Sequence, residues 1–148
     1  INGKNKVESV TVQKTDTGGN PIPKTKYDID CDFVCISDGL APLSEIGSLL
    51  NLKHVYTDSL GGYVPLHSKN MQTELPNLYV AGNVTGIENA KIAMLQGRAA
   101  AFNILGYKGR LSDTLRHIDD ERKNAKVKFH TDLIAGRAML EDMWQLQK

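Results

Sequence analysis

The residues best suited to chemistry lie in the stretch TELPNLYVAGNVTG, residues 73–86. Four mostly apolar residues, 78–81, precede Gly82 and Asn83, which predicts a buried strand that ends on a glycine turn. A glycine lets the backbone come close to a ligand, and the amide of Asn83 can both accept and donate hydrogen bonds. The helix predicted from Glu88 would point its backbone N–H groups at the same place. The pattern predicts a cofactor-binding turn, although a plain core strand followed by a turn fits it equally well.

The two cysteines, Cys31 and Cys35, invite a redox-dithiol interpretation. On a strand, residues four apart are separated by a rise of about 13 Å, whereas disulfide-bonded Cα atoms lie within about 7 Å of each other. The two thiols therefore cannot pair if this segment is a strand. We predict that they are buried and unreactive.

The histidines show no metal-ligand spacing, so we expect no metal site. They are His54, His67, His117 and His130. We predict that His54 and His67 lie on surface loops before the glycine turn, from which one of them could approach a substrate. The charged run at residues 116–128 alternates in sign, which predicts a solvated helix face and not a nucleic-acid patch.

The elements that position these residues are predicted to be strands first and helices later. Residues 6–15 are rich in β-branched residues and predict a strand; the turn formers at 16–23 and the run at 24–30 then predict a hairpin. The next run, DFVCIS at residues 32–37, is continuously apolar, which predicts a buried parallel strand. A turn at 38–42 follows it.

The middle of the chain is predicted to alternate helix and strand. Residues 43–52 predict a short helix, with apolar residues at helical spacing. These are Leu43, Ile46, Leu49 and Leu50. A short strand is predicted around 62–66, and residues 88–106 predict a helix with a stripe of small residues for close packing. The stripe consists of Ala90, Ala93, Gly97, Ala100 and Ala101.

From Leu111 onward the chain is predicted to be helical, with two amphipathic faces. One face carries Leu111, Leu115 and Ile118, and the other carries Leu133, Leu140 and Trp144. We predict that Trp144 and Met143 belong to the core or to an interface between helices.

Several of these features together resemble one family. The motif at residues 73–83 resembles the second flavin-binding motif of the two-dinucleotide-domain flavoproteins, the pyridine nucleotide–disulfide oxidoreductase-like superfamily. CDFVCISDGLAP, residues 31–42, resembles the turn at which a buried strand leaves the nicotinamide-nucleotide domain of that superfamily. The small-residue helix is similar to the family's closing helix, which packs against the glycine loop of the flavin domain. Within the superfamily, residues 7–106 are most similar to the alpha-type subunits of heterotetrameric sarcosine oxidase, dye-linked proline dehydrogenase and hydrogen cyanide synthase.

The resemblance implies an α/β fold made of partial FAD/NAD(P)-binding Rossmann-like domains, namely a β-meander plus a closing strand and helix, with a C-terminal helical extension. It places the end of the NAD(P)-binding domain at residues 1–52. The C-terminal segment of the FAD-binding domain falls at 53–106, and the helical extension at 107–148.

The resemblance also implies which residues bind the cofactor. The FAD-binding residues would be Gly82, Asn83, Val84, Thr85 and Gly86. The family usually has Asp where Asn83 stands, so the charge of that flavin contact is lost here. NAD(P) is a further possible cofactor, and no catalytic residue can be named.

No GxGxxG loop, which would hold the dinucleotide pyrophosphate, occurs in the chain. The resemblance therefore implies the C-terminal part of a FAD-dependent oxidoreductase subunit that binds flavin weakly or not at all by itself. The whole enzyme would act on amines or imino acids, or pass electrons from NAD(P)H. The alternative is a non-catalytic flavoprotein-like assembly or binding module that docks a partner subunit.

The bulk composition narrows the partners and the setting. The chain has 148 residues, a formal net charge of +1 and 41% hydrophobic residues, so its charge points to neither nucleic acid nor an anionic membrane. No apolar run approaches the ~20 residues of a transmembrane helix, and two cysteines without a disulfide framework suit a cytoplasmic setting. A chain that begins at Ile1 within strand-like sequence suggests a missing N-terminal portion or a partner subunit, in a hetero- or homo-oligomer.

Overall fold

The computed structural model describes residues 1–17, 19–37, 39–125 and 132–147. The chain divides into two units, Ile1–Gly39 and Leu40–Lys148, which are described separately. The domain boundaries predicted after residues 52 and 106 follow the family's domains and not this division, and they stay predictions.

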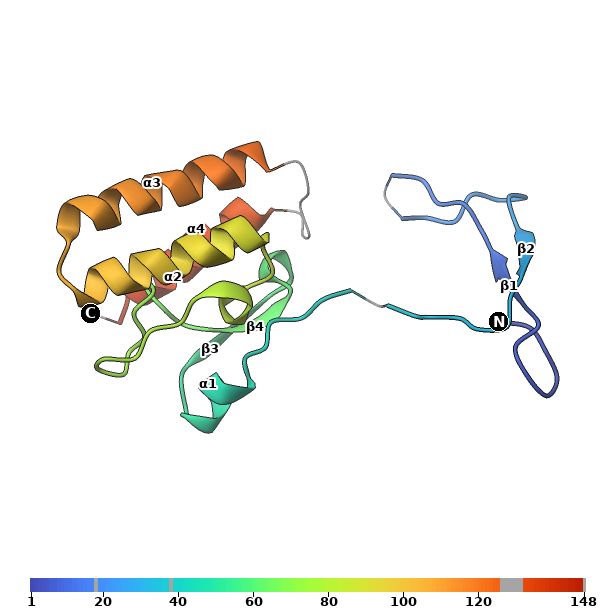
Figure 1. The fold of residues 1–148 in the computed structure, drawn as a ribbon, viewed down its shortest axis with the longest axis horizontal. Helices are drawn as coiled ribbons and strands as arrows, with labels where there is room; N and C mark the ends of the chain where they lie inside the picture. The colour runs from blue at the N-terminus through green and yellow to red at the C-terminus, as the bar shows by residue number, and fades with distance from the viewer. Residues whose placement is uncertain (18, 38, 126–131, 148) are drawn as a thin grey trace. The chain divides into compact units, whose positions relative to one another are not determined.

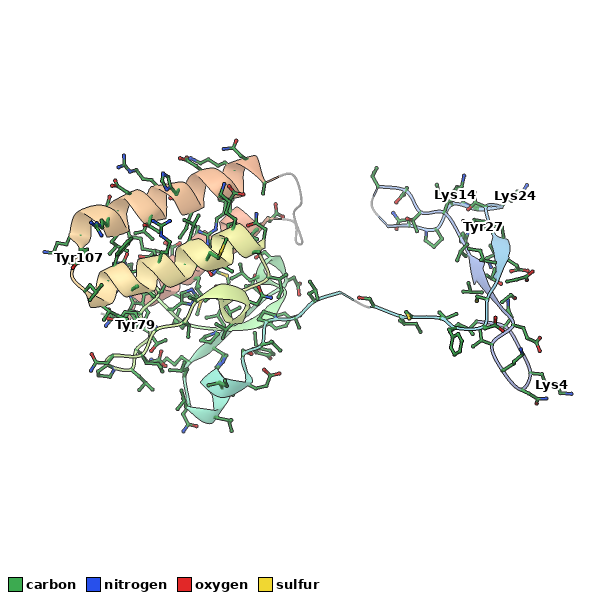
Figure 2. All side chains as sticks on the ribbon, in the orientation of Figure 1. Lys4, Lys14, Lys24, Tyr27, Tyr79 and Tyr107 are labelled. Atoms are coloured by element: carbon green, nitrogen blue, oxygen red, sulfur yellow. The ribbon has the colours of Figure 1, made fainter. Side chains whose placement is uncertain are left out.

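The predicted hairpin forms the first unit. Strand β1 (Ser9–Val12) pairs antiparallel with β2 (Tyr27–Asp30), and Val10 lies opposite Ile29 (Figure 1). The hydroxyl of Thr11 donates a hydrogen bond of 2.6 Å to Asp28 across the two strands. Lysines 4, 14 and 24 are exposed and project from this unit (Figure 2).

The predicted buried parallel strand at residues 32–37 is not formed. No strand is assigned there, and Phe33 and Ile36 are 88% and 78% exposed. The prediction of buried cysteines is wrong for the same reason, since Cys35 is exposed and Cys31 is half-buried; both are free thiols. A buried parallel strand needs a parallel neighbour and a cover on both faces of the sheet, and both sheets in the described part of the chain are two-stranded and antiparallel.

The second unit begins with a short helix and a hairpin. Helix α1 (Glu45–Leu49) is followed by strand β3 (His54–Thr57), which pairs antiparallel with β4 (Gly62–Pro65) (Figure 1). The 3-10 helix η1 (Asp58–Leu60) joins the two strands. The strand predicted around 62–66 is confirmed, whereas β3 was not predicted.

The second half of this unit is helical. The 3-10 helix η2 (Gly82–Thr85) precedes helix α2 (Ala90–Ile104), and α3 (Lys108–Asn124) lies beside α2 in the opposite direction (Figure 1). The last helix is α4 (Leu133–Gln145). The predicted helix over 88–106 is thus confirmed, and so is the helical tail over 108–124 and 133–145; residues 126–131 of the tail lie outside the described residues.

Two hydrophobic clusters hold the second unit together. One joins α2 to α3 and buries Met71, Ile92, Leu95, Ala99, Leu111 and Ile118. The other joins the β3–β4 hairpin to α4 and buries Val55, Leu60, Val64, Leu66 and Leu140. Leu133 and Trp144 pack against the second cluster and Leu115 against the first, so both predicted amphipathic faces are confirmed.

Much of the apolar side of α1 and part of the small-residue stripe of α2 are exposed. The apolar side of α1 is open, since Leu43, Ile46 and Leu49 are 69%, 72% and 81% exposed. In the small-residue stripe of α2, Ala90, Gly97 and Ala101 are also exposed. Ala93 and Ala100 of the same stripe are half-buried, and Ala100 packs against the first cluster. The described residues thus show a mixed α/β composition, with an open apolar side of α1 and a stripe on α2 that is covered in part.

Candidate functional site

The predicted cofactor turn is a tight turn between an extended segment and α2. Residues 78–81 form no strand, although Tyr79 (labelled in Figure 2) makes an isolated antiparallel bridge with Gln72. Gly82 then adopts φ +80° and starts η2. This left-handed conformation favours glycine, so the turn depends on Gly82 for its backbone shape.

The backbone of the turn is held from inside the unit by Gln96 of α2. The Gly82 N–H donates a 2.7 Å hydrogen bond to Gln96 Oε1. The Thr85 hydroxyl lies 2.9 Å from the Gly82 carbonyl oxygen and 3.2 Å from the same Gln96 oxygen. The Gly82 N–H is therefore already satisfied within the protein and is not free for a ligand.

The five predicted residues of the turn differ in their exposure. Asn83 is exposed, and its side chain has no hydrogen-bond partner among the described residues. Val84 is half-buried, whereas Thr85 and Gly86 are buried. A Cβ on Gly82 would meet only Ala93, at 3.7 Å, while one on Gly86 would lie 3.1 Å from Leu60. The turn thus presents Asn83 outward and packs Thr85 and Gly86 inward.

Helix α2 begins two residues after the predicted position, and its first turn is capped by its own sequence. The side chain of Asn89 accepts a 2.9 Å hydrogen bond from the Ile92 N–H. An asparagine in this position satisfies one of the N–H groups that a helix start leaves without a partner.

A charged group not predicted from the sequence lies behind the turn. The Glu88 carboxylate accepts hydrogen bonds of 2.8 and 2.9 Å from Arg122 of α3, and another from Arg137 Nη2 of α4. The three side chains are only 4%, 13% and 11% exposed. With Thr85 and Gln96, they form what we call the polar cluster.

The polar cluster keeps Glu88 ionised. Burial by itself would raise the pKa of Glu88, but the hydrogen bonds and positive charges of Arg122 and Arg137 hold that pKa below its usual range. Burial also lowers the pKa of Arg137 to about 10. Arg137 Nη2 also donates a 3.3 Å hydrogen bond to Thr85, while Nε and Nη1 are buried without a partner among the described residues.

His67 is buried close to the polar cluster and not on a surface loop, which corrects the prediction for this residue. Its Nδ1 lies 2.7 Å from the carbonyl oxygen of Pro65. A carbonyl only accepts, so Nδ1 carries the proton. Burial, together with the charge of Arg137, lowers the pKa of His67 to about 3, so the imidazole is neutral at pH 7. His54, on β3, is half-buried, and His130 lies outside the described residues.

Two cavities flank the polar cluster. One, of about 340 Å³, lies between α3, α4 and the segment after β4, and His67, Arg122 and Arg137 line it. The other, of about 430 Å³, includes Glu88 and Arg122 in its wall. Within the described chain, residues 82–86 line neither cavity, so the predicted cofactor turn lies outside both.

Other candidate sites are weaker. Among the described residues, no group of three His, Cys, Asp or Glu side chains could hold a metal ion. No described helix is long and apolar enough to span a membrane.

The predicted solvated face at 116–128 is wrong for Arg122, which is mostly buried against Glu88. Residues 126–128 lie outside the described residues.

The polar cluster escaped prediction because its members are far apart in sequence. Arg122 and Arg137 lie 34 and 49 residues after Glu88. Arg137 stands among small and apolar residues in the first half of α4. This position suggests a buried charge, but the sequence does not identify its partner.

Sequence comparison places the chain beside several oxidoreductases. Over 82% of its length it is 26% identical to an opine oxidase subunit of Rhizobium meliloti, and the match covers 25% of that protein. It is 28% identical to a hydrogen cyanide synthase subunit of Pseudomonas protegens, over 84% of this chain and 27% of that relative. It is 37% identical to a dihydrolipoyl dehydrogenase of Chlamydia muridarum, over 47% of this chain and 16% of that enzyme.

These comparisons confirm the predicted resemblance at low identity and over part of each relative. The chain is similar to oxidoreductases of the FAD-dependent type, and two of the three are named as subunits. It spans about a quarter or less of the length of these relatives. No family model matches the chain, and no solved structure matches it.

Proposed function

We propose that the chain is the closing part of a FAD-dependent oxidoreductase subunit. In the full-length subunit it would complete Rossmann-like FAD- and NAD(P)-binding domains, with boundaries at 1–52, 53–106 and 107–148. The enzyme would act on amines or imino acids, or pass electrons from NAD(P)H. The similarity to a subunit of an opine oxidase and to a subunit of a hydrogen cyanide synthase supports the assignment as an oxidoreductase subunit.

One observation carries the flavin assignment. Directly before α2, Gly82 adopts a conformation that favours glycine, and the next residue, Asn83, is exposed without a side-chain partner in the described part of the chain. A glycine lets a ligand approach the backbone closely, and an exposed polar side chain next to it can form a hydrogen bond with that ligand. We therefore propose that Gly82, Asn83, Val84, Thr85 and Gly86 form the flavin-contacting turn.

The chemistry of the turn fits a flavin contact through two groups. The Asn83 amide can donate to or accept from a polyhydroxylated chain, and half-buried Val84 supplies an apolar surface next to it. Gly82 contributes its backbone shape, because Gln96 already binds its N–H. Thr85 and Gly86 support the turn from its buried side. A bound flavin supplies the electron-transfer chemistry, and these residues orient it.

The open apolar faces fit both this proposal and the alternative, a non-catalytic module that docks a partner subunit, because both require packing against further polypeptide. A module that functions by itself is expected to cover its large apolar residues. Here Ile46 and Leu49 of α1 and Met94 of α2 are 72%, 81% and 66% exposed. Such faces fit a chain that packs against further polypeptide, either in the same subunit or in a partner.

The experiment is a visible absorption spectrum of the purified full-length subunit, followed by FAD titration of its apo form. We expect stoichiometric flavin. Replacing Asn83 by Ala should weaken FAD binding by roughly tenfold, the effect of losing about one hydrogen bond. The matched control is Asn5→Ala, because Asn5 is also exposed but lies in the first unit.

The outcomes separate two claims. A full-length subunit without flavin would sink the proposed function. Stoichiometric flavin together with an unchanged affinity in Asn83→Ala would remove Asn83 from the site and leave the function standing. The Asn83→Asp variant tests whether the carboxylate that the family usually carries there improves binding.

A further inference from the structure

We infer that Gln96 is a positioning residue for the turn at residues 82–86, and that the C-terminal helices α3 and α4 stabilise the orientation of its side-chain amide through Glu88. The inference rests on the proposed function only where it treats this turn as a cofactor turn. The connection runs from Arg122 and Arg137 through Glu88 to Gln96, and from Gln96 to the backbone of Gly82.

Gln96 connects the turn to the charged part of the polar cluster. Its Oε1 accepts from the Gly82 N–H at 2.7 Å and lies 3.2 Å from the Thr85 hydroxyl. Its Nε2 donates to Glu88 Oε1 at 3.3 Å. Gln96 is 1% exposed, so water does not compete for these bonds. One buried amide thus joins a backbone donor on one side to a carboxylate on the other.

Hydrogen-bond chemistry allows a single orientation of this amide. The backbone N–H of Gly82 can only donate, so the atom of Gln96 that faces it must be the oxygen. An ionised carboxylate can only accept, so the atom that faces Glu88 must be the NH₂ group. Rotating the amide by 180° would place a donor against a donor and an acceptor against an acceptor. Both mismatches would be buried, where they are costly.

The Gly82 N–H fixes one end of the amide, and the charge of Glu88 fixes the other end; that charge depends on α3 and α4. A carboxylic acid buried without partners becomes protonated, and a protonated carboxyl can donate to the Gln96 oxygen. Arg122 of α3 and Arg137 of α4 prevent this, because both donate to the Glu88 oxygens. Arg137 also bonds Thr85 directly at 3.3 Å. The helical extension therefore acts on the turn through hydrogen bonds, although residues 82–86 line neither cavity beside the tail.

The test is the exchange rate and the proton chemical shift of the Gly82 amide in the 148-residue chain, measured by NMR. Gln96→Met keeps the length of the side chain and removes the acceptor. We expect the Gly82 amide to exchange about tenfold faster, as for loss of one buried hydrogen bond, and its proton to shift upfield. The buried Ala99 amide of α2 should not change, which shows that the fold is intact.

The matched control is Gln145→Met. Like Gln96, Gln145 donates a hydrogen bond to a glutamate, here Glu141 of α4. Among the described residues, Gln145 makes no hydrogen bond with the turn. This variant should leave the Gly82 amide unchanged. If Gln96→Met leaves both the exchange rate and the shift of Gly82 unchanged, Gln96 does not position the turn and the inference is overturned.

The role of the tail is tested with Arg137. Arg137→Met should accelerate Gly82 exchange and shift its proton in the same direction as Gln96→Met, while Arg137→Lys, which retains a positive charge, should restore part of both. A side chain that only filled space would show no rescue by lysine over methionine. Equal Gly82 signals in Arg137→Met and in the unmodified chain would break the proposed connection to α4.

These measurements need no flavin, so they can fail or succeed independently of the proposed function. FAD titration of the full-length subunit carrying Gln96→Met then tests whether the hydrogen-bond network affects flavin binding. A lower affinity supports a positioning role at a cofactor turn. A changed Gly82 amide with unchanged flavin affinity would keep the hydrogen-bond network and reject the cofactor role of the turn.

Discussion

Helices α1 and α2 both carry apolar residues at helical spacing, but they differ in how far other elements cover those residues. Ile92 and Ala99 of α2 are 2% and 0% exposed, whereas Ile46 and Leu49 of α1 are 72% and 81% exposed. Helix α3 packs along α2. Helix α1 instead approaches the hairpin through Gly47, where a Cβ would lie 3.0 Å from His54. An apolar pattern therefore identifies a face that can be buried, and a separate element must supply the cover.

Helices α1 and α2 also differ in the hydrogen bonds that their side chains make with other elements. Helix α2 is joined to α3 and α4 through Gln96 and the adjoining Glu88. For α1, the N-cap residue Ser44 makes no capping hydrogen bond with its side chain. We expect mutations at α2 and its partners to destabilise the fold and matched mutations at α1 to be almost neutral.

The largest expected effect is that of Glu88→Ala. It leaves Arg122 and Arg137 buried without their anion, and breaking a buried ion pair from one side costs about 3–5 kcal/mol. Urea unfolding followed by circular dichroism measures the loss. The control is Glu45→Ala on α1, an exposed residue, which should change stability by less than about 0.5 kcal/mol. Equal effects at the two positions would contradict the contrast between the helices.

The next prediction compares two isoleucines. Ile118 of α3 is 2% exposed against α2, and Ile46 of α1 is 72% exposed. Ile118→Ala should cost about 3 kcal/mol, from lost burial and the cavity left behind. Ile46→Ala should cost almost nothing, because alanine also has the higher helix propensity. If Ile46→Ala proved as costly as Ile118→Ala, the face of α1 would be covered in solution.

The elements predicted correctly depend on local sequence. The β-branched run before a dense turn gave β1 and β2, and apolar spacing located α2 and the helical tail to within a few residues. Local rules sufficed here because each of these elements finds its partner within the described chain. The glycine at position 82 also revealed the turn, since its positive φ is a property of the backbone there.

What could not be predicted depends on distant partners. Phe33 and Ile36 have the pattern of a buried strand, but no described segment pairs with them, and they remain exposed. Conversely, Arg122 stands in a run of charges and looks solvated, yet Glu88 lies 2.8 Å from it. His67 resembles a loop residue in sequence, yet it is 2% exposed and lines a cavity together with residues of α3 and α4. Burial is decided by tertiary contacts that local patterns do not encode.

Acid should destabilise the second unit of the chain because His67 is buried there as a neutral imidazole. Its pKa is about 3 in the folded protein and about 6.5 in the unfolded chain. Between these values only the unfolded state binds the proton, so stability falls as the pH falls. We expect a loss of about 2 kcal/mol between pH 7 and pH 5, from about 1.4 kcal/mol per pH unit below 6.5. Urea unfolding at each pH measures it.

His67→Asn should remove most of this pH dependence, since the amide can still donate to the Pro65 carbonyl but does not titrate. His117→Asn is the control, because His117 is exposed on α3; its pH profile should match that of the unmodified chain. The pKa of Glu88 is lowered in the folded protein. Its ionised form therefore contributes to stability above its ordinary pKa, and this contribution is lost only as the pH falls through the lowered pKa. A profile unchanged by His67→Asn would show that His67 is not buried as a neutral imidazole.

The smallest effect compares the two helix starts. Asn89 caps α2 by accepting from the Ile92 N–H at 2.9 Å, whereas Ser44, in the same position before α1, makes no such bond. Asn89→Ala should therefore cost about 1 kcal/mol, and Ser44→Ala should change stability by only a few tenths. Urea unfolding again measures both. A cost for Ser44→Ala equal to that for Asn89→Ala would mean that α1 is capped in solution, and that the contrast between the helices lies in their cover alone.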